Sequence, residues 1–206
     1  MHPHPTDPPN TETELERLLQ TRNRYPELTE AIDAQIRATF MRTYAILVMD
    51  SSGFSRLSQQ RGIIAALAEI ERLRGVVVPV IQAHQGSVFK IEVDNVYAVF
   101  PNVELAIAAS HAMIQQAASI DQHVSIGIGY GELLMIAEGD RYRDVYGEEM
   151  NLASKLGEDL AGVDEVLLTD AAFANLNCQR EQWEKQTMSI SSLELQVYRQ
   201  RNNHSC

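Results

Sequence analysis

Apolar residues recur at helical spacing near the start of the chain, in two groups separated by Pro26. Residues three and four positions apart share one face of a helix, and a proline interrupts a helix. The pattern therefore predicts two short amphipathic helices within residues 13–41, which either pack on their own domain or form a dimerising or signal-relaying collar. The apolar positions are Leu15, Leu18, Leu19, Leu28, Ile32, Ile36 and Phe40.

Apolar runs of strand length and longer helical stretches follow. YAILVM at residues 44–49 predicts a strand buried on both faces, and residues 57–83 predict a long helix interrupted or strained around Gly75 and Pro79. GSVFKIE and NVYAVF predict a hairpin that turns at Val93 and Asp94. Residues 103–118 predict a further helix.

The second half of the chain continues the alternation. HVSIGIGYG predicts a strand, LLMIA a partner strand, GDRYRD a polar loop, residues 147–160 a helix and EVLLT a strand. A short helix near Ala171 and a hairpin ending in LELQVYRQ close the chain. The order strand, helix, hairpin, helix, strand is that of a ferredoxin-like α+β core with elements added to it.

Length and composition favour a single globular domain. The chain has 206 residues, of which 45% are hydrophobic and 22% charged, close to the average of soluble globular proteins. Four of the seven prolines fall within residues 1–12, which we expect to be a disordered leader. The leader is followed by a helical segment at residues 13–41, the main domain at residues 42–200 and a tail at residues 201–206.

The net charge and the lack of recognisable targeting signals disfavour several classes of function. A formal net charge of −11 disfavours binding to nucleic acid or to acidic membrane surfaces, so a polyanionic ligand requires local cations or a metal. No apolar run is long enough to cross a bilayer, and the first residues lack the pattern of a signal peptide. Cys178 and Cys206 cannot make a disulfide framework. We expect a cytoplasmic protein.

Asp50 and Asp94 are the first candidates for chemistry. Asp50 follows a buried strand and opens the loop SSGFS, in which Gly53 permits a tight turn and the backbone amides can point at phosphate oxygens. Asp94 lies in the turn of the next hairpin, which neighbours the first strand in a ferredoxin-like core. The two carboxylates could share hard cations such as Mg²⁺ or Mn²⁺, although a helix cap and a turn former explain them as well.

A second cluster lies in DVYGEEMNLASK. Asp144 precedes a predicted helix, and Asn151 and Lys155 share one face of it because they are four residues apart. An amide and an ammonium one turn apart can hold a sugar and a phosphate. A capped amphipathic helix with a solvated lysine is the alternative.

Four segments together resemble the catalytic domain of class III adenylyl and guanylyl cyclases. They are DSSGFS from Asp50, KIEVD at residues 90–94, IGIGYGE around Gly127 and Gly131, and DVYGEEMNLASK from Asp144. They resemble the family's Asp and Gly-Phe-Thr/Ser loop, KxxGD, Gly-Ile-x-x-Gly and D(I/V)(W/Y)GxxVNxAxR. The resemblance runs from about residue 44 to residue 173 and includes the closing hairpin, so it implies that residues 42–200 are a nucleotidyl cyclase catalytic domain.

The resemblance implies a role for each matched residue. Asp50, Asp94 and the backbone carbonyl of Ser51 would hold two Mg²⁺ or Mn²⁺ ions in each active site. Metals so placed suit attack of the ribose 3′ oxygen on the α-phosphorus with loss of pyrophosphate. The other implied roles belong to the substrate-binding loop Ser52, Gly53 and Phe54, the purine-reading pair Lys90 and Asp144, the ribose-orienting Asn151, and Lys155 in the place of a transition-state arginine.

Base preference and assembly follow from these roles. Lys90 donates to a ring acceptor and Asp144 accepts from an exocyclic amine, which suits adenine and therefore ATP. In the family, the metal aspartates come from one subunit and the base, ribose and transition-state residues from the other. The resemblance thus implies a homodimer with two sites. A cyclase that uses GTP or a pyrimidine triphosphate, and a nucleotide-binding regulatory module of the same fold, are the alternatives.

Three positions depart from the family pattern. Val93 replaces the hairpin glycine and, being β-branched, resists positive φ, so we expect the turn to differ or to shift its tight residue to Asn95. Lys155 replaces an arginine and loses its fork geometry, which predicts slow turnover. Ser191 and Ser192 stand where the family has a Lys-Gly pair that helps to hold the triphosphate, which predicts altered phosphate binding.

Overall fold

A computed structural model describes residues 10–139, 141–190 and 193–201. The expected disordered leader, nearly all of the tail, and the pair Ser191 and Ser192 lie outside the described residues.

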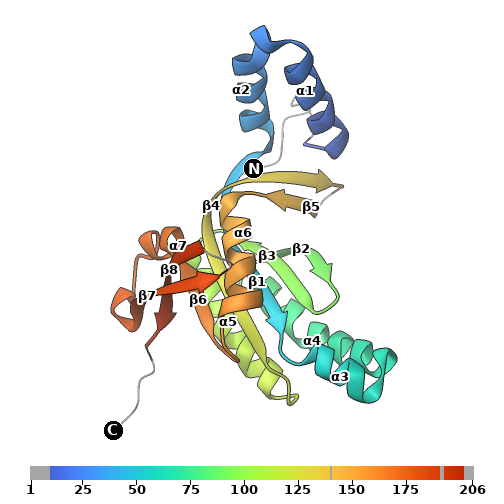
Figure 1. Cartoon of the computed structure of the whole chain (residues 1–206), viewed down its shortest axis with the longest axis vertical. Helices are drawn as coiled ribbons and strands as arrows, with labels where there is room; N and C mark the ends of the chain where they lie inside the picture. The colour runs from blue at the N-terminus through green and yellow to red at the C-terminus, as the bar shows by residue number, and fades with distance from the viewer. Residues whose placement is uncertain (1–9, 140, 191–192, 202–206) are drawn as a thin grey trace.

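The centre of the molecule is the predicted ferredoxin-like α+β arrangement (Figure 1). Strand β3 lies between β1 and β2, and β4 flanks β1 on the other side, so the order is β2-β3-β1-β4 and each neighbour is antiparallel. Helices precede β2 and β4, as the fold requires. The elements of this core are β1 (Met41–Ser51), α3 (Phe54–Arg61), α4 (Ile63–Ala83), β2 (Ser87–Glu92), β3 (Asn95–Phe100), α5 (Val103–Ala118) and β4 (Val124–Glu138).

Later elements extend the same sheet on the other side of β4. Strand β6 pairs parallel with β4, and β8 and β7 continue the sheet to its edge, while β5 pairs antiparallel with the far part of β4. The added elements are β5 (Arg141–Tyr146), α6 (Glu148–Ser154), the π-helical turn η2 (Lys155–Leu160), β6 (Val166–Thr169), α7 (Asp170–Ala174), η3 (Arg180–Gln182), β7 (Trp183–Ile190) and β8 (Leu193–Gln200).

Two apolar layers cover the two faces of the sheet. Side chains alternate along β1, so that Ala45, Leu47 and Met49 pack against α4 and α5. Ile46 and Val48 face the opposite side, where they pack with residues of β3, β4 and β5 and with α6. The strand is therefore buried on both faces, as its continuous apolar sequence predicts.

The predicted N-terminal helices are present as α1 (Glu12–Arg24) and α2 (Thr29–Phe40), joined by the short η1 (Pro26–Leu28). They form a hairpin that lies against the β4–β5 ribbon, on its side away from the rest of the sheet (Figure 1). Leu15, Leu18 and Phe40 pack there against Ile136 of β4. Within the described ranges, no helix is long and apolar enough to cross a membrane.

The helical stretch after β1 breaks at a different place from the one predicted. The break falls at Gly62, whose φ of 83° is in the glycine region, and α4 continues through Gly75 and Pro79. Pro79 lacks the N–H that would bond to the Gly75 carbonyl four residues earlier. Burial of Leu73, Val77 and Ile81 against the sheet outweighs that loss.

The second half of the sheet also differs from the prediction. LLMIA is not a partner strand but the continuation of β4, which runs unbroken from Val124 to Glu138. Its partner is β5, formed by residues that the sequence marks as a polar loop. The side chains of residues 133–136 pack alternately into two apolar clusters, and this burial on both faces stabilises the extended part of the strand.

Candidate active site

Asp50 and Asp94 lie together at one end of the central strands. Asp50 is the next-to-last residue of β1, and Asp94 lies in the β2–β3 turn beside it because Met49 of β1 pairs with Val96 of β3. Partial burial, and after it the negative charge of the nearby Asp94, together raise the pKa of Asp50 to about 7. The structure thus brings the two predicted metal-binding carboxylates into one electrostatic environment.

The turn that carries Asp94 is built differently from the expectation. Val93 itself adopts a positive φ of 43°, so the tight position is not shifted to Asn95. The guanidinium of Arg74 on α4 donates a hydrogen bond to the Val93 carbonyl, and the Val93 side chain is half exposed. An anchored carbonyl and an uncrowded side chain allow a β-branched residue to hold a conformation that costs about 1–2 kcal/mol.

The loop after Asp50 leads into the start of α3. Gly53 has a φ of 97°, which only glycine adopts without strain, and α3 begins at Phe54. The Ser52 N–H already donates to the His123 carbonyl at 2.9 Å. Since the first N–H groups of a helix have no intrahelical partner, Gly53 and Phe54 are the loop residues whose amides suit a phosphate.

The donor set around Asp50 fits a hard divalent cation. Two carboxylates and the carbonyl of the buried Ser51 would offer oxygen ligands to such an ion, and the Oδ1 atom of Asn95, next to Asp94 in the chain, is buried without a hydrogen-bond partner. Within the described part of the chain, neither Asp50 nor Asp94 forms an ion pair. No group of three or more His, Cys, Asp or Glu side chains is placed to hold a metal among these residues, so the fit rests on two carboxylates and a backbone carbonyl.

Lys90 and Asp144 form a second, separate group. Lys90 lies on β2 and Asp144 on β5, two strands that contact each other. A hydrogen bond to Glu92, with an ion pair of 2.9 Å, raises the pKa of Lys90 most, and the negative charge of Asp144 adds to the effect. Asp144 accepts a hydrogen bond of 3.3 Å from the Tyr146 hydroxyl. The structure therefore brings the predicted base-reading pair together.

Asn151 lies on α6, and Lys155, four residues later, is the first residue of the π-helical turn. Asn151 is exposed and Lys155 half-buried. The helix passes unusually close to the sheet, because a Cβ on Gly127 of β4 would lie 2.2 Å from the Ala153 carbonyl oxygen and 2.6 Å from the Gly157 nitrogen. Because Gly127 has no side chain, the helix can approach the sheet closely, and this approach determines how far Asn151 and Lys155 lie from the sheet.

One functional neighbour was missed by the sequence reasoning. Glu158 adds to the negative charge around Asp50, and its carboxylate accepts a hydrogen bond of 3.1 Å from the hydroxyl of Tyr97. The same hydroxyl lies 3.4 Å from Glu92, the partner of Lys90, so these contacts connect the two groups. Glu158 lies on the π-helical turn, where α-helical spacing does not continue, so the sequence pattern gave no signal for it.

Comparison with known proteins gives a relative of low identity. No protein-family profile matches the chain. A protein of Rhizobium meliloti (strain 1021) named Putative adenylate cyclase 3 is 26% identical over 137 residues, which cover 63% of this chain. The chain spans 22% of the length of that relative.

Solved structures decide the fold. The guanylyl cyclase Cya2 superposes with a TM-score of 0.66 at 15% identity, over 80% of this chain and 96% of that one. The adenylyl cyclase CyaB from P. aeruginosa superposes with a TM-score of 0.62 at 17% identity, over 80% and 97%. The chain has the fold of a class III nucleotidyl cyclase catalytic domain. On this nucleotidyl cyclase fold, the four segments that carry the resemblance lie at β1, the β2–β3 hairpin, β4, and β5 with α6.

Proposed function

We propose that the protein converts ATP to 3′,5′-cyclic AMP and pyrophosphate, as a phosphorus–oxygen lyase. The observation that carries this proposal is the pairing of side chains on a nucleotidyl cyclase fold: Asp50 with Asp94, and Lys90 with Asp144. Each pair joins residues far apart in the sequence, and each has the charge that its role requires.

The base is read by Lys90 and Asp144. Asp144, as an acceptor, suits the exocyclic amine of adenine, and Lys90 donates to a ring nitrogen. In the free chain Lys90 is occupied by Glu92, so substrate binding exchanges this carboxylate for the purine. Guanine carries a carbonyl in place of the amine and calls for a donor where Asp144 stands. This difference favours ATP over GTP.

The reacting atoms are held by the other residues. Asn151 orients the ribose, Lys155 donates to the phosphate on which charge develops, and the amides of Gly53 and Phe54 receive phosphate oxygens. Divalent cations held by Asp50, Asp94 and the Ser51 carbonyl would supply positive charge against the triphosphate and make the ribose 3′ hydroxyl easier to ionise. Two Mg²⁺ or Mn²⁺ ions per site match this donor set.

The two groups suit a site shared by two copies of the chain. The charges that act on Lys90 come from Glu92, Asp144 and Tyr146, and those that act on Asp50 come from Asp94, Glu158 and Asp159. In the arrangement that the resemblance implies, each group is half of a site. A symmetric homodimer sets the aspartates of one copy opposite the base and ribose residues of the other, which makes two complete sites.

A cyclisation assay tests the proposal. The purified chain is incubated with Mn²⁺ or Mg²⁺ and with each of the four nucleoside triphosphates in turn, and the cyclic product is identified by mass. We expect cyclic AMP as the main product. A preference for GTP or for a pyrimidine triphosphate would keep the cyclase and change its substrate. Binding without turnover would make the protein a regulatory module.

Two substitutions examine the carboxylates within this assay. Asp50→Asn and Asp94→Asn keep the size of each side chain and remove its charge, so we expect each to reduce turnover by at least about a hundredfold with either metal. Circular dichroism and the melting temperature show whether the fold is kept. Activity near that of the wild type in either variant would overturn the assignment of these carboxylates.

A further inference from the structure

Strand β5 contains a β-bulge immediately before Asp144. Ile136 of β4 pairs with Asp144, and the next residue, Ala137, pairs with Tyr142, so Arg143 is the extra residue of the pair of strands. A bulge changes the direction in which the following side chains point. The bulge at Arg143 therefore sets the direction of Asp144, the residue proposed to accept from the base.

The segment that leads into α1 is attached to this bulge. The carbonyl of Asn10 accepts a hydrogen bond of 2.9 Å from the backbone N–H of Ala137, opposite the bulge. The carboxylate of Glu12 pairs with the guanidinium of Arg143 at 3.1 Å, and Glu138 lies 4.0 Å from the same group. The contacts of Asn10 and Glu12 thus join the N-terminal segment to Ala137 and Arg143, the two residues at which the pairing of β4 and β5 is irregular.

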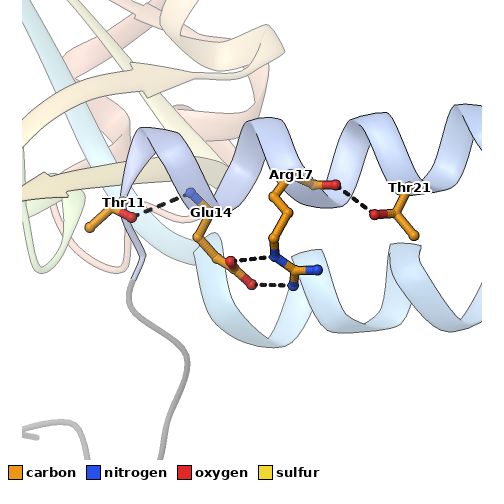
Figure 2. Close-up of polar contacts among 4 residues, drawn as sticks. All are labelled: Thr11, Glu14, Arg17 and Thr21. Carbon is orange, nitrogen blue, oxygen red and sulfur yellow. Dashed lines mark hydrogen bonds and ion pairs between the residues drawn. The ribbon is translucent and has the colours of Figure 1, made fainter.

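The start of α1 is fixed, so Glu12 has a defined position. The hydroxyl of Thr11 accepts a hydrogen bond from the Glu14 N–H and caps the helix, and Glu14 pairs with Arg17 at 2.7 Å (Figure 2). A capped first turn frays little.

Glu12 also lies close to the proposed base site. Leu134 and Ile136, the cross-strand partners of Tyr146 and Asp144, pack against the N-terminal helices, and cross-strand partners lie on one face of a sheet. The helices therefore cover the face that carries Asp144. Consistent with this, the charge of Asp144 raises the pKa of the Tyr146 hydroxyl, and the charge of Glu12 adds to the effect.

We propose that residues 10–12 and Arg143 form a clamp that holds the β5 bulge and so positions Asp144 for discrimination between adenine and guanine. Glu12 and Arg143 are positioning residues, because neither is proposed to touch the nucleotide. This inference rests on the proposed function, in which Asp144 accepts from the base. It adds that the N-terminal helices, through the clamp, tune which triphosphate is used.

A double-mutant cycle tests the clamp in the full chain. We measure kcat and KM for ATP and for GTP in Glu12→Ala, in Arg143→Ala and in the double variant. Each single change should lower the ratio of kcat/KM for ATP to kcat/KM for GTP roughly fivefold. A change of this size corresponds to the loss of one well-formed exposed ion pair. The double variant should lose no more than either single variant, because both changes remove the same contact.

Arg17→Gln is the matched control, since it also removes one ion pair of α1 but no contact with β5. It should leave the ratio unchanged. If Arg17→Gln lowers the ratio as much as Glu12→Ala does, or if the losses of the two clamp variants add, the clamp is wrong. If the wild type discriminates and both clamp variants keep its ratio, the clamp alone fails. If the wild type cyclises no triphosphate, the proposed function fails and removes the basis of the clamp.

Discussion

Lys155 is the residue at which this chain departs most directly from the chemistry of the resembled family. It is half-buried at the start of the π-helical turn, four residues after Asn151. An ammonium acts as a point charge, whereas a guanidinium offers a planar pair of donors to two phosphate oxygens. The position therefore keeps the sign of the charge and loses its bidentate geometry.

Lys155→Arg should raise kcat for ATP. Charge that builds on the phosphate in the transition state would then meet two charge-assisted hydrogen bonds instead of one, and we expect a gain of up to about tenfold. Steady-state kinetics with Mn²⁺ measures it. Lys155→Gln serves as the comparison and should lower kcat. An unchanged or lower kcat in Lys155→Arg would show that Lys155 does not face the phosphate.

Glu149 connects stability to pH. Burial raises its pKa above the ordinary value of 4.5, although the carboxylate accepts hydrogen bonds from the Thr169 hydroxyl and the Tyr130 N–H. A carboxyl whose pKa is raised by folding holds its proton more tightly in the folded state. Its contribution to the free energy of unfolding is therefore complete below pH 4.5 and is lost as the pH rises through the raised pKa.

Glu149→Gln should weaken this dependence on pH, because an amide oxygen accepts the same two hydrogen bonds and does not ionise. Urea unfolding at a series of pH values above 4.5 measures the slope. The exposed Glu181→Gln, at a residue that does not contribute to the pKa of Glu149, is the control and should leave the slope as it is. A slope that is equally steep in wild type and Glu149→Gln would contradict the assignment.

At the scale of elements, α6 and the π-helical turn depend on two glycines that face each other. A Cβ on Gly157 would lie 2.5 Å from the Val48 carbonyl oxygen, and one on Gly127 would collide with the Ala153 carbonyl oxygen. The Ser125 hydroxyl also donates to the Gly157 carbonyl at 2.8 Å. The carbonyl oxygens that the two added Cβ atoms would meet belong to the backbone, so a rotamer change cannot relieve either collision.

Gly127→Ala should lower the free energy of unfolding by about 3 kcal/mol or more, the upper end of overpacking costs. It should also reduce turnover, because α6 must move away from the sheet with Asn151. Gly75→Ala is the control: nothing lies within 4 Å of its added Cβ, and alanine should stabilise the exposed helix by about 1 kcal/mol. Thermal denaturation compares the two. Equal melting temperatures would show that the helix approaches the sheet less closely.

Most elements were predictable from the sequence, because their apolar periods are clear. Strand β5 was not, for a physical reason: its bulge places Tyr142 and Val145, three residues apart, against the same apolar cluster, so the period of two disappears. Asp50, Asp94, Lys90 and Asp144 were predicted from motifs, and the structure brings them together in pairs. Glu158 was not predicted, since its approach to Asp50 depends on the π-helical turn and on tertiary packing.

For the whole molecule, the shared-site homodimer makes a prediction of its own. Asp50→Ala and Asn151→Ala damage opposite halves of each site, so each homodimer should be nearly inactive. A mixed dimer combines both lesions in one site and leaves the other site intact. After exchange of equal amounts, about half of the dimers are mixed, and activity should recover to roughly a quarter of wild type.

The control for this experiment is a mixture of Asp50→Ala and Asp94→Ala, whose lesions lie in the same half and should restore nothing. Native mass spectrometry verifies that subunits have exchanged. An inactive first mixture after verified exchange would exclude the shared site. A forced wild-type monomer that still cyclises ATP would place the whole site within one chain.

The position of β1 in the centre of the sheet also determines how the chain must fold. Both partners of β1 come much later in the sequence: Ala45 pairs with Phe100, and Ser51 pairs with Val124. Such distant pairings fold slowly, and during synthesis the apolar β1 leaves the ribosome with both edges open until β3 and β4 follow. Nascent chains that stall before β4 therefore expose an aggregation-prone strand, and slower synthesis at low temperature together with chaperones should favour recovery of the folded protein.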